Sequence, residues 1–134
     1  MKYPVSIKGV LVKNGQVLLV KNERNEWELP GGRIEIGESS EQCLKREMFE
    51  ELKIDVKIQN IVGTRLFEVI EEQYVFLVAY LCEMAEENEN IEISDEHIDY
   101  KWFQVGELPR NQLPKEYIEL IEMAMKTCVK EEKQ

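Results

Sequence analysis

The chain is poor in the residues that define several common classes of metal-binding and secreted proteins. It has a single histidine, His97, which excludes a metal site built from several histidines. Its three cysteines, Cys43, Cys82 and Cys128, are odd in number, widely spaced and contain no C-x-x-C pair. The sequence therefore indicates neither a zinc site nor a disulfide framework. A reducing, cytoplasmic location is the simplest interpretation.

Long apolar runs and excess positive charge are also missing. No apolar run approaches the ~20 residues of a transmembrane helix, and the N-terminal stretch MKYPVSIKGVLVKNG lacks the pattern of a cleaved signal peptide. The formal net charge is −10, without the basic face of a protein that binds nucleic-acid polymers. The sequence thus predicts neither a membrane nor a nucleic-acid polymer as partner. A small anionic substrate would need a metal ion to reverse the local charge.

The pattern of apolar residues predicts one domain over residues 1–134, with a frayed tail at about 130–134. The order of elements is strands, helix, strands, helix, which indicates a mixed sheet with helices packed on it. Asn14-Gly15 is a strong hairpin signal between the first two strands. The predicted strands are 5–12, 16–21, 27–29, 34–36, 54–61, 62–69, 74–82, 91–93 and 100–105, and the predicted helices are 39–53 and 114–129. The nearly continuous apolar run 74–82 is typical of a strand covered on both faces.

Three glutamates lie on one face of the first predicted helix. Glu47, Glu50 and Glu51 have the spacing i, i+3, i+4, which places their carboxylates close together. Such carboxylates repel one another, and a chain tolerates the repulsion where a cation lies among them. Oxygen ligands of this kind suit Mg²⁺. Ser39 and Gln42 form the sequence pattern of a capping box at the start of the helix.

The stretch around these glutamates resembles the Nudix box, G-x5-E-x7-R-E-U-x-E-E-x-G-U, where U is apolar. The matching residues are Gly32, Glu38, Arg46, Glu47, Met48, Glu50, Glu51 and Ile54. The preceding sequence WELPG is also typical of the family. Lys53 replaces the last Gly of the box. Either Lys53 adopts the left-handed conformation of that Gly, at a cost of about 1 kcal/mol, or the helix continues through it.

The resemblance implies an α/β fold, a Nudix-like α/β/α sandwich whose mixed sheet lies between helices, with a loop–helix–loop catalytic element. It also implies hydrolysis of a nucleoside diphosphate linked to another moiety, with Mg²⁺ or Mn²⁺ as cofactor. The implied metal ligands are Glu47, Glu50, Glu51 and the backbone carbonyl of Gly31. Arg46 is implied to pair with a glutamate of the box and so to support catalysis. Gly32, Glu38 and Ile54 are implied to be structural.

Many Nudix proteins place a further acid in a loop before a late strand that contains tryptophan. Here the loop before Trp102 offers Glu96 as first candidate and Asp95 as second. Glu96 is the candidate for the fourth metal ligand or the general base, and Glu47 is its rival as base. His97 is expected to be a surface or strand-cap residue, and Cys43 a small packed residue.

The resemblance favours a nucleoside triphosphate or a modified nucleotide as substrate, as in MutT-type members. Purine-reading relatives carry an Asn just ahead of the final helix, whereas Asn111 lies earlier here, so ADP-ribose and nucleotide sugars remain alternatives. An alternative of another class is a catalytically silent Nudix-like nucleotide-binding regulatory domain, which would be expected to lose the acids that this chain keeps. Arg24 and Trp27 are candidates for substrate contact, although Trp27 and Trp102 are first expected to be packing residues. A homodimer is left open.

Overall fold

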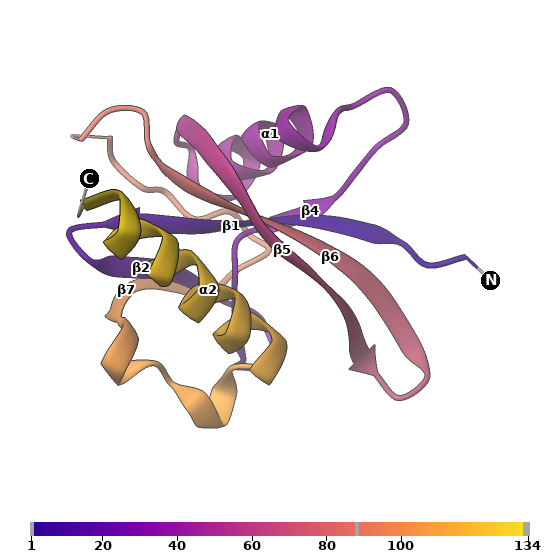
Figure 1. Cartoon of the computed structure of the whole chain (residues 1–134). Coiled ribbons are helices and arrows are strands. Elements are labelled where there is room, and N and C mark those ends of the chain that lie inside the picture. Colours follow the sequence, from indigo (N-terminus) through magenta and orange to yellow (C-terminus); the bar gives the residue numbers. More distant parts are fainter. Residues whose placement is uncertain (1, 88, 133–134) are drawn as a thin grey trace.

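The computed structural model of the chain describes residues 2–87 and 89–132, with side chains described up to residue 128. Figure 1 shows a sheet with a helix on either side. The elements are β1 (Val5–Lys13), β2 (Gln16–Lys21), β3 (Trp27–Glu28), β4 (Gly31–Arg33), α1 (Ser40–Leu52), β5 (Val56–Ile70), β6 (Gln73–Met84), β7 (Asp99–Gln104), the short 3₁₀ helices η1 (Val105–Glu107) and η2 (Arg110–Gln112), and α2 (Lys115–Glu132).

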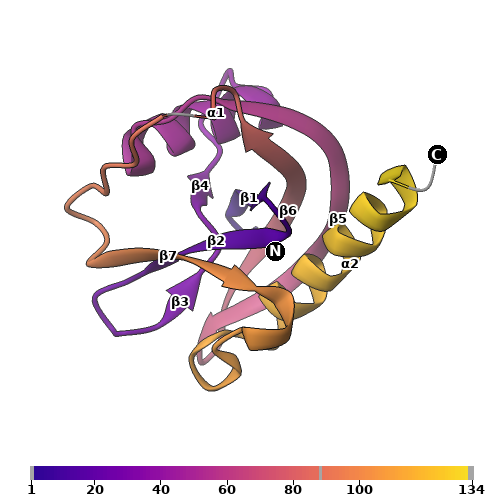
Figure 2. The same cartoon turned by 90° about the vertical axis from the view of Figure 1, so that its left-hand side faces the viewer.

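The sheet is mixed, and it lies between the two helices. Its strand order is β3-β2-β1-β6-β5, with β4 paired to β1 and β7 paired to β2. The pairing of β1 with β6 is parallel, and the other pairings are antiparallel. Figure 2 shows β5 curving around the molecule between α1 and α2. The expected α/β/α arrangement is confirmed.

Strand alternation separates the core into two clusters, one beneath each helix. In β1, Ile7 and Leu11 pack with α1, whereas Val10 packs with α2. The α1 cluster includes Leu18, Val20, Cys43, Leu44, Met48, Leu52, Ile54, Val56 and Cys82. The α2 cluster includes Val17, Leu19, Trp27, Leu29, Phe67, Leu77, Phe103, Tyr117, Leu120, Ile121 and Ala124. The packing predicted for Trp27 is confirmed, with its ring edge-on to Phe103 at a centroid distance of 5.0 Å.

The first helix begins and ends as its sequence suggests. The Ser39 side chain accepts a hydrogen bond from the Gln42 backbone, and the Gln42 side chain accepts one from the Ser39 backbone, so the predicted capping box is confirmed. At the other end Lys53 has φ 58° and ψ 35°, and its N–H donates to the carbonyl of Phe49. The helix therefore stops before Lys53, which occupies the left-handed conformation of the glycine it replaces.

Several predicted strand boundaries are wrong. Residues 34–36 form no strand, because the glycine pair itself belongs to β4 and pairs with β1. The two strands expected at 54–61 and 62–69 are one strand, β5, whose pairing with β6 shifts register near Ile61. The shift changes which side chains face the core, so the alternation breaks there without ending the strand.

Two further expectations fail for reasons of packing. Residues 91–93 form no strand, because the N–H groups of Glu92 and Ser94 donate to the last carbonyls of α1, those of Leu52 and Glu51. The run 74–82 is covered on both faces only in its second half, since Tyr74 and Phe76 are exposed beyond the edge of α1.

The last helix is longer than predicted. It runs to Glu132 instead of about 129, and residues 133–134 of the predicted frayed tail lie outside the described residues. Across the described ranges, no helix is long and apolar enough to cross a membrane.

Candidate active site

The glycine pair of β4 lets the backbone pass between β1 and α1. Gly31 has φ 138°, and a side chain there would collide with the backbone carbonyl of Ile7. A Cβ on Gly32 would lie 2.5 Å from the carboxyl carbon of Glu47. Gly31 is therefore needed for the close approach to β1, and Gly32 is needed so that the Glu47 carboxylate can lie directly against the strand.

Arg46 connects the acids of the helix to the preceding loop. Its Nε donates to Glu38 Oε2 at 2.6 Å and one terminal nitrogen donates to Glu38 Oε1 at 3.0 Å, a two-point contact with the carboxylate. The other terminal nitrogen lies 2.8 Å from Glu47 Oε1 and 3.1 Å from Glu50 Oε2. The predicted pairing of Arg46 with a glutamate of the box is confirmed. These hydrogen bonds hold the pKa of Glu38 at about 2, so Glu38 remains ionised.

Glu51 is the most buried carboxylate of the site. Its Oε2 accepts a hydrogen bond of 2.8 Å from the Gly31 N–H, and the residue is only 4% exposed. Burial raises the pKa of Glu51 to about 7. Burial also raises the pKa of Glu47, and the charges of Glu50 and Glu96 add to this effect. A divalent cation would relieve this accumulation of partly desolvated carboxylates.

The donor chemistry fits a hard cation such as Mg²⁺, because every candidate ligand is an oxygen. The present arrangement uses those oxygens differently: Glu47 and Glu50 accept from Arg46, and Glu51 accepts from Gly31. Within the described residues, no three histidine, cysteine or acidic side chains are gathered closely enough to hold a metal. The fit therefore rests on the type and neighbourhood of the donors.

The acidic loop contributes an exposed candidate and a buried residue that the sequence did not reveal. Glu96 and Asp95 are exposed, and Glu96 is close enough to Glu47 for their charges to interact. His97 is only 7% exposed, so the expectation of a surface or strand-cap residue is wrong. The ring of His97 lies inside because Nε2 makes a 3.0 Å hydrogen bond with Glu28 Oε1, across the sheet, and lies 3.9 Å from Glu51 Oε1.

Glu28 and His97 form a hydrogen-bonded pair, which becomes an ion pair when His97 is protonated. Burial disfavours the charge of Glu28, but the hydrogen bond with His97 and the charge of Lys8 outweigh burial and lower its pKa. Burial likewise opposes protonation of His97, but Glu28 and Glu51 raise its pKa. The sequence analysis did not single out Glu28, because its partner His97 lies 69 residues further along the chain.

The sequence-predicted Cys43 and Ile54 are packing residues in the structure. Both are fully buried in the α1 cluster. Burial raises the pKa of the Cys43 thiol to about 11, which leaves it a poor nucleophile. Its Sγ donates weakly to the Gly32 carbonyl at 3.6 Å.

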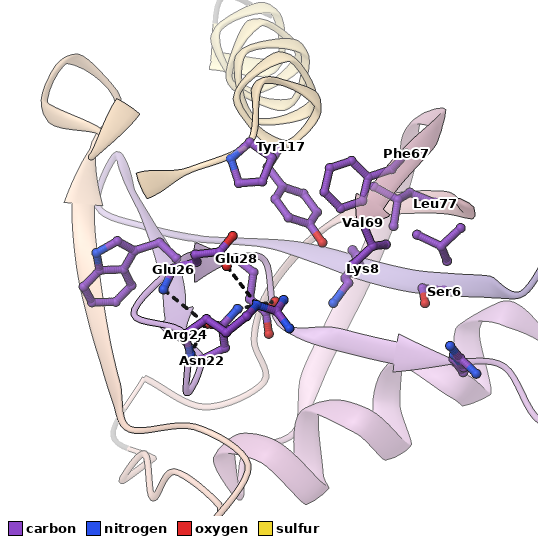
Figure 3. A pocket seen from close by; sticks show the side chains of 14 residues that line it. Ser6, Lys8, Asn22, Arg24, Glu26, Glu28, Phe67, Val69, Leu77 and Tyr117 are labelled. Atoms are coloured by element: carbon purple, nitrogen blue, oxygen red, sulfur yellow. Dashed lines mark hydrogen bonds and ion pairs between the residues drawn. The ribbon is translucent and has the colours of Figure 1, made fainter. Parts of the chain in front are cut away.

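A cavity of about 170 Å³ opens on the α2 side of the sheet (Figure 3). Glu47, Glu50 and Glu51 do not line it, but Lys8 in its wall is close enough to Glu47 and Glu51 for their charges to interact. Arg24 and Trp27, the predicted candidates for substrate contact, line it. Asn111 does not; it is exposed on η2. The other residues of the wall come from β1, the β2–β3 connection, β4, the β5–β6 hairpin and the start of α2: Ser6, Lys8, Asn22, Glu26, Glu28, Arg33, Phe67, Val69, Val75, Leu77, Pro114 and Tyr117.

The sandwich fold, the glycine-bordered acidic helix and its arginine clamp are those of a Nudix protein. A family model described as the NUDIX domain matches residues 2–124, and the chain belongs to that family. A solved structure, that of the MutT NUDIX hydrolase from Burkholderia pseudomallei, superposes with a TM-score of 0.80 over 92% of this chain and 98% of that one. At 23% identity this likeness shows the fold alone.

Curated relatives agree with this assignment. The "NAD-capped RNA hydrolase NudC" of Mannheimia succiniciproducens is 32% identical over 142 residues, which cover 94% of this chain and 51% of the relative. The "Putative 8-oxo-dGTP diphosphatase" of Bacillus subtilis is 31% identical over 107 residues, which cover 78% of this chain and 68% of the relative. The chain spans about half the length, or less, of several curated relatives that it matches.

Proposed function

We propose that this chain is a Mg²⁺-dependent pyrophosphohydrolase that cleaves the diphosphate linkage of a nucleotide, with a nucleoside triphosphate or modified nucleotide as its substrate. The observation that carries the proposal is the cluster of Glu47, Glu50 and Glu51, held by Arg46 and Gly31 near a cavity of about 170 Å³. Relatives named as diphosphatases of nucleoside triphosphates support the substrate class. A cytoplasmic location and a homodimer remain predictions.

Glu47, Glu50, Glu51 and the Gly31 carbonyl are proposed to hold Mg²⁺ or Mn²⁺. The chemistry that the cation supplies is positive charge against the diphosphate oxygens. Arg46 keeps Glu38 ionised and, through its hydrogen bonds to Glu47 and Glu50, fixes the positions of these two acids. Glu47 and Glu96, which lie close enough for their charges to interact, are the two rival candidates for the base that accepts a proton from the attacking water.

A hydrolysis screen tests the proposal. Purified protein is incubated with Mg²⁺ or Mn²⁺ and with nucleoside triphosphates, ADP-ribose, nucleotide sugars and dinucleoside polyphosphates, and the products are separated by chromatography. We expect pyrophosphate from a triphosphate, and loss of turnover when the cation is chelated. Turnover of ADP-ribose or nucleotide sugars alone would show that these, and not nucleoside triphosphates, are the substrates. No turnover of any compound in the screen would favour a catalytically silent binding domain.

The site assignment is tested with a matched pair of variants on the same helix. Glu51→Gln removes the charge of the proposed ligand while its amide oxygen can still accept from Gly31, so the fold is expected to persist in circular dichroism. We expect kcat to fall by roughly a hundredfold or more, in the range of other charge deletions at catalytic centres. Glu41→Gln, on the exposed first turn of α1, should leave kcat unchanged. Retained turnover in Glu51→Gln would refute the assignment.

A further inference from the structure

Lys8 is a buried cation whose ammonium group has no polar partner in the part of the chain that the structure describes. It lies on β1, is 8% exposed and lines the cavity. Its nearest described interaction is with the ring of Tyr117, whose centroid is 6.0 Å from Nζ. An ammonium group has three hydrogen-bond donors, and those of Lys8 face the cavity, where a ligand can accept from them.

The position of Lys8 follows from strand alternation. Ile7 packs under α1, so Lys8 points to the α2 side, as Ser6 and Val10 do. Figure 3 shows its side chain extending from β1 into the hollow, next to Tyr117. The donor group therefore reaches the space that a ligand would occupy.

Two carboxylates, those of Glu28 and Glu51, act on the charge of Lys8. Burial disfavours the ammonium form, but the surrounding groups outweigh burial and raise the pKa of Lys8. The neighbouring Arg24 is paired with Glu26 at 2.8 Å. Because the carboxylates of Glu26 and Glu28 lie in the same wall, a neutral acceptor such as a carbonyl oxygen fits beside Lys8 better than an anionic group.

The walls of the cavity suit a flat ring. Phe67, Leu77, Pro114 and Tyr117 present apolar surface, and the volume of about 170 Å³ lies below the ~300 Å³ of the smallest pockets for drug-sized ligands. The cavity can enclose one ring system, and the remainder of a nucleotide would extend out of it. The amide of Asn22, another polar group of the wall, is already used by Arg24, Glu26 and Glu28.

We propose that Lys8 is a specificity-determining residue that donates a hydrogen bond to an exocyclic carbonyl oxygen of the nucleobase held in this cavity. The chain then prefers bases that carry such a carbonyl over adenine, which has none. The proposal rests on the proposed function only in requiring that the ligand is a nucleotide.

Inosine and adenosine nucleotides form the sharpest test, because hypoxanthine carries a carbonyl oxygen where adenine carries an amino group. Binding of IMP and AMP is measured by titration calorimetry with Mg²⁺, and turnover of ITP and ATP is measured separately. A hydrogen bond from a charged donor predicts a preference for inosine of roughly ten- to a hundredfold in Kd and in kcat/KM. In Lys8→Met, which keeps the length of the side chain and removes its donors, this preference should disappear through loss of affinity for the inosine ligands.

Lys101→Met is the matched control. Lys101 is an exposed strand lysine that also lies over an aromatic ring, 5.3 Å from the centroid of Phe103, but it does not line the cavity. It should keep the inosine preference. Thermal unfolding of each variant verifies that the proteins compared are folded.

The outcomes separate this proposal from the proposed function. Equal binding and turnover of both bases by the wild type would overturn the role of Lys8 while leaving the hydrolase intact. An equal loss for both bases in Lys8→Met would also overturn it, because Lys8 would then act on the carboxylates instead of the base. Selective IMP binding without any turnover would refute the hydrolase and keep the base-reading role. If Lys8→Met does not fold, Lys8→Leu, which also removes the donors, replaces it, and an unchanged inosine preference in Lys8→Leu overturns the proposal.

Discussion

At the scale of single residues, Arg46 shows why the box requires arginine. Two nitrogens of its guanidinium group donate hydrogen bonds to Glu38. Its other N–H groups donate to Glu47, Glu50 and the backbone carbonyl of Arg33. A lysine has one compact ammonium and cannot contact these groups in one plane. The geometry of the acids thus depends on a side chain that carries out no chemistry itself.

Lys53 is a second single-residue feature with a measurable cost. Its φ of 58° predicts that Lys53→Gly raises the free energy of unfolding, by up to about 1 kcal/mol, because glycine adopts this conformation without strain. Urea denaturation followed by circular dichroism measures the change.

Lys45→Gly serves as the matched control, since Lys45 is exposed inside α1. There glycine should lower the free energy of unfolding by about 1 kcal/mol. Similar destabilisation in both variants would contradict the strained conformation at Lys53.

At the scale of elements, the close contact of β4 with α1 positions the catalytic acids. Gly32→Ala would put a methyl group 2.5 Å from the carboxyl carbon of Glu47 and force that carboxylate away. We expect kcat/KM to fall by roughly ten- to a hundredfold, as for other misplacements of catalytic groups, with little change in Tm. Steady-state kinetics and calorimetry on one preparation measure both.

Gly106→Ala provides the comparison for that experiment. A Cβ at Gly106 meets no atom within 4 Å, and its φ lies outside the left-handed range, so activity should be unaffected. If Gly32→Ala retains full activity, the Glu47 carboxylate does not need its place against β4.

The elements also show what could be predicted from sequence. The capped helix α1 and the Asn14-Gly15 hairpin rest on contacts between residues near in the chain, and both were predicted. The strand β4 was missed, because its two glycines are extended only through pairing with β1. The burial of His97 and the unpaired Lys8 were missed for the same reason: each depends on partners brought together by the sheet, which no local pattern contains.

At the scale of the whole molecule, an acidic chain of net charge −10 buries part of its negative charge at one site. Without a cation, the raised pKa of Glu51, about 7, means that the native state binds more protons than the unfolded chain between about pH 4.5 and 7. Stability due to this group therefore falls as pH rises through that range. The pKa values of Glu38 and Glu28 are lowered, so the stability due to these two groups rises with pH instead, mainly below about pH 4.5.

We predict that the metal-free protein loses stability on going from pH 5 to pH 8 and that Mg²⁺ restores more of it at pH 8. The share of Glu51 is on the order of 2–3 kcal/mol. Urea unfolding at pH 5 and pH 8, with EDTA or with Mg²⁺, measures the free energy of unfolding under each condition. Glu51→Gln should show a smaller pH dependence, and an identical slope in both proteins would contradict the raised pKa.

The amide hydrogen bonds from Glu92 and Ser94 to the end of α1 have a consequence for motion. They make the last turn of the catalytic helix and the loop that carries Glu96 a cooperative opening unit, in the sense used for hydrogen exchange. The loop cannot swing out without uncovering the carbonyls of Leu52 and Glu51. Opening of this loop is therefore coupled to fraying of the helix that holds the proposed metal ligands.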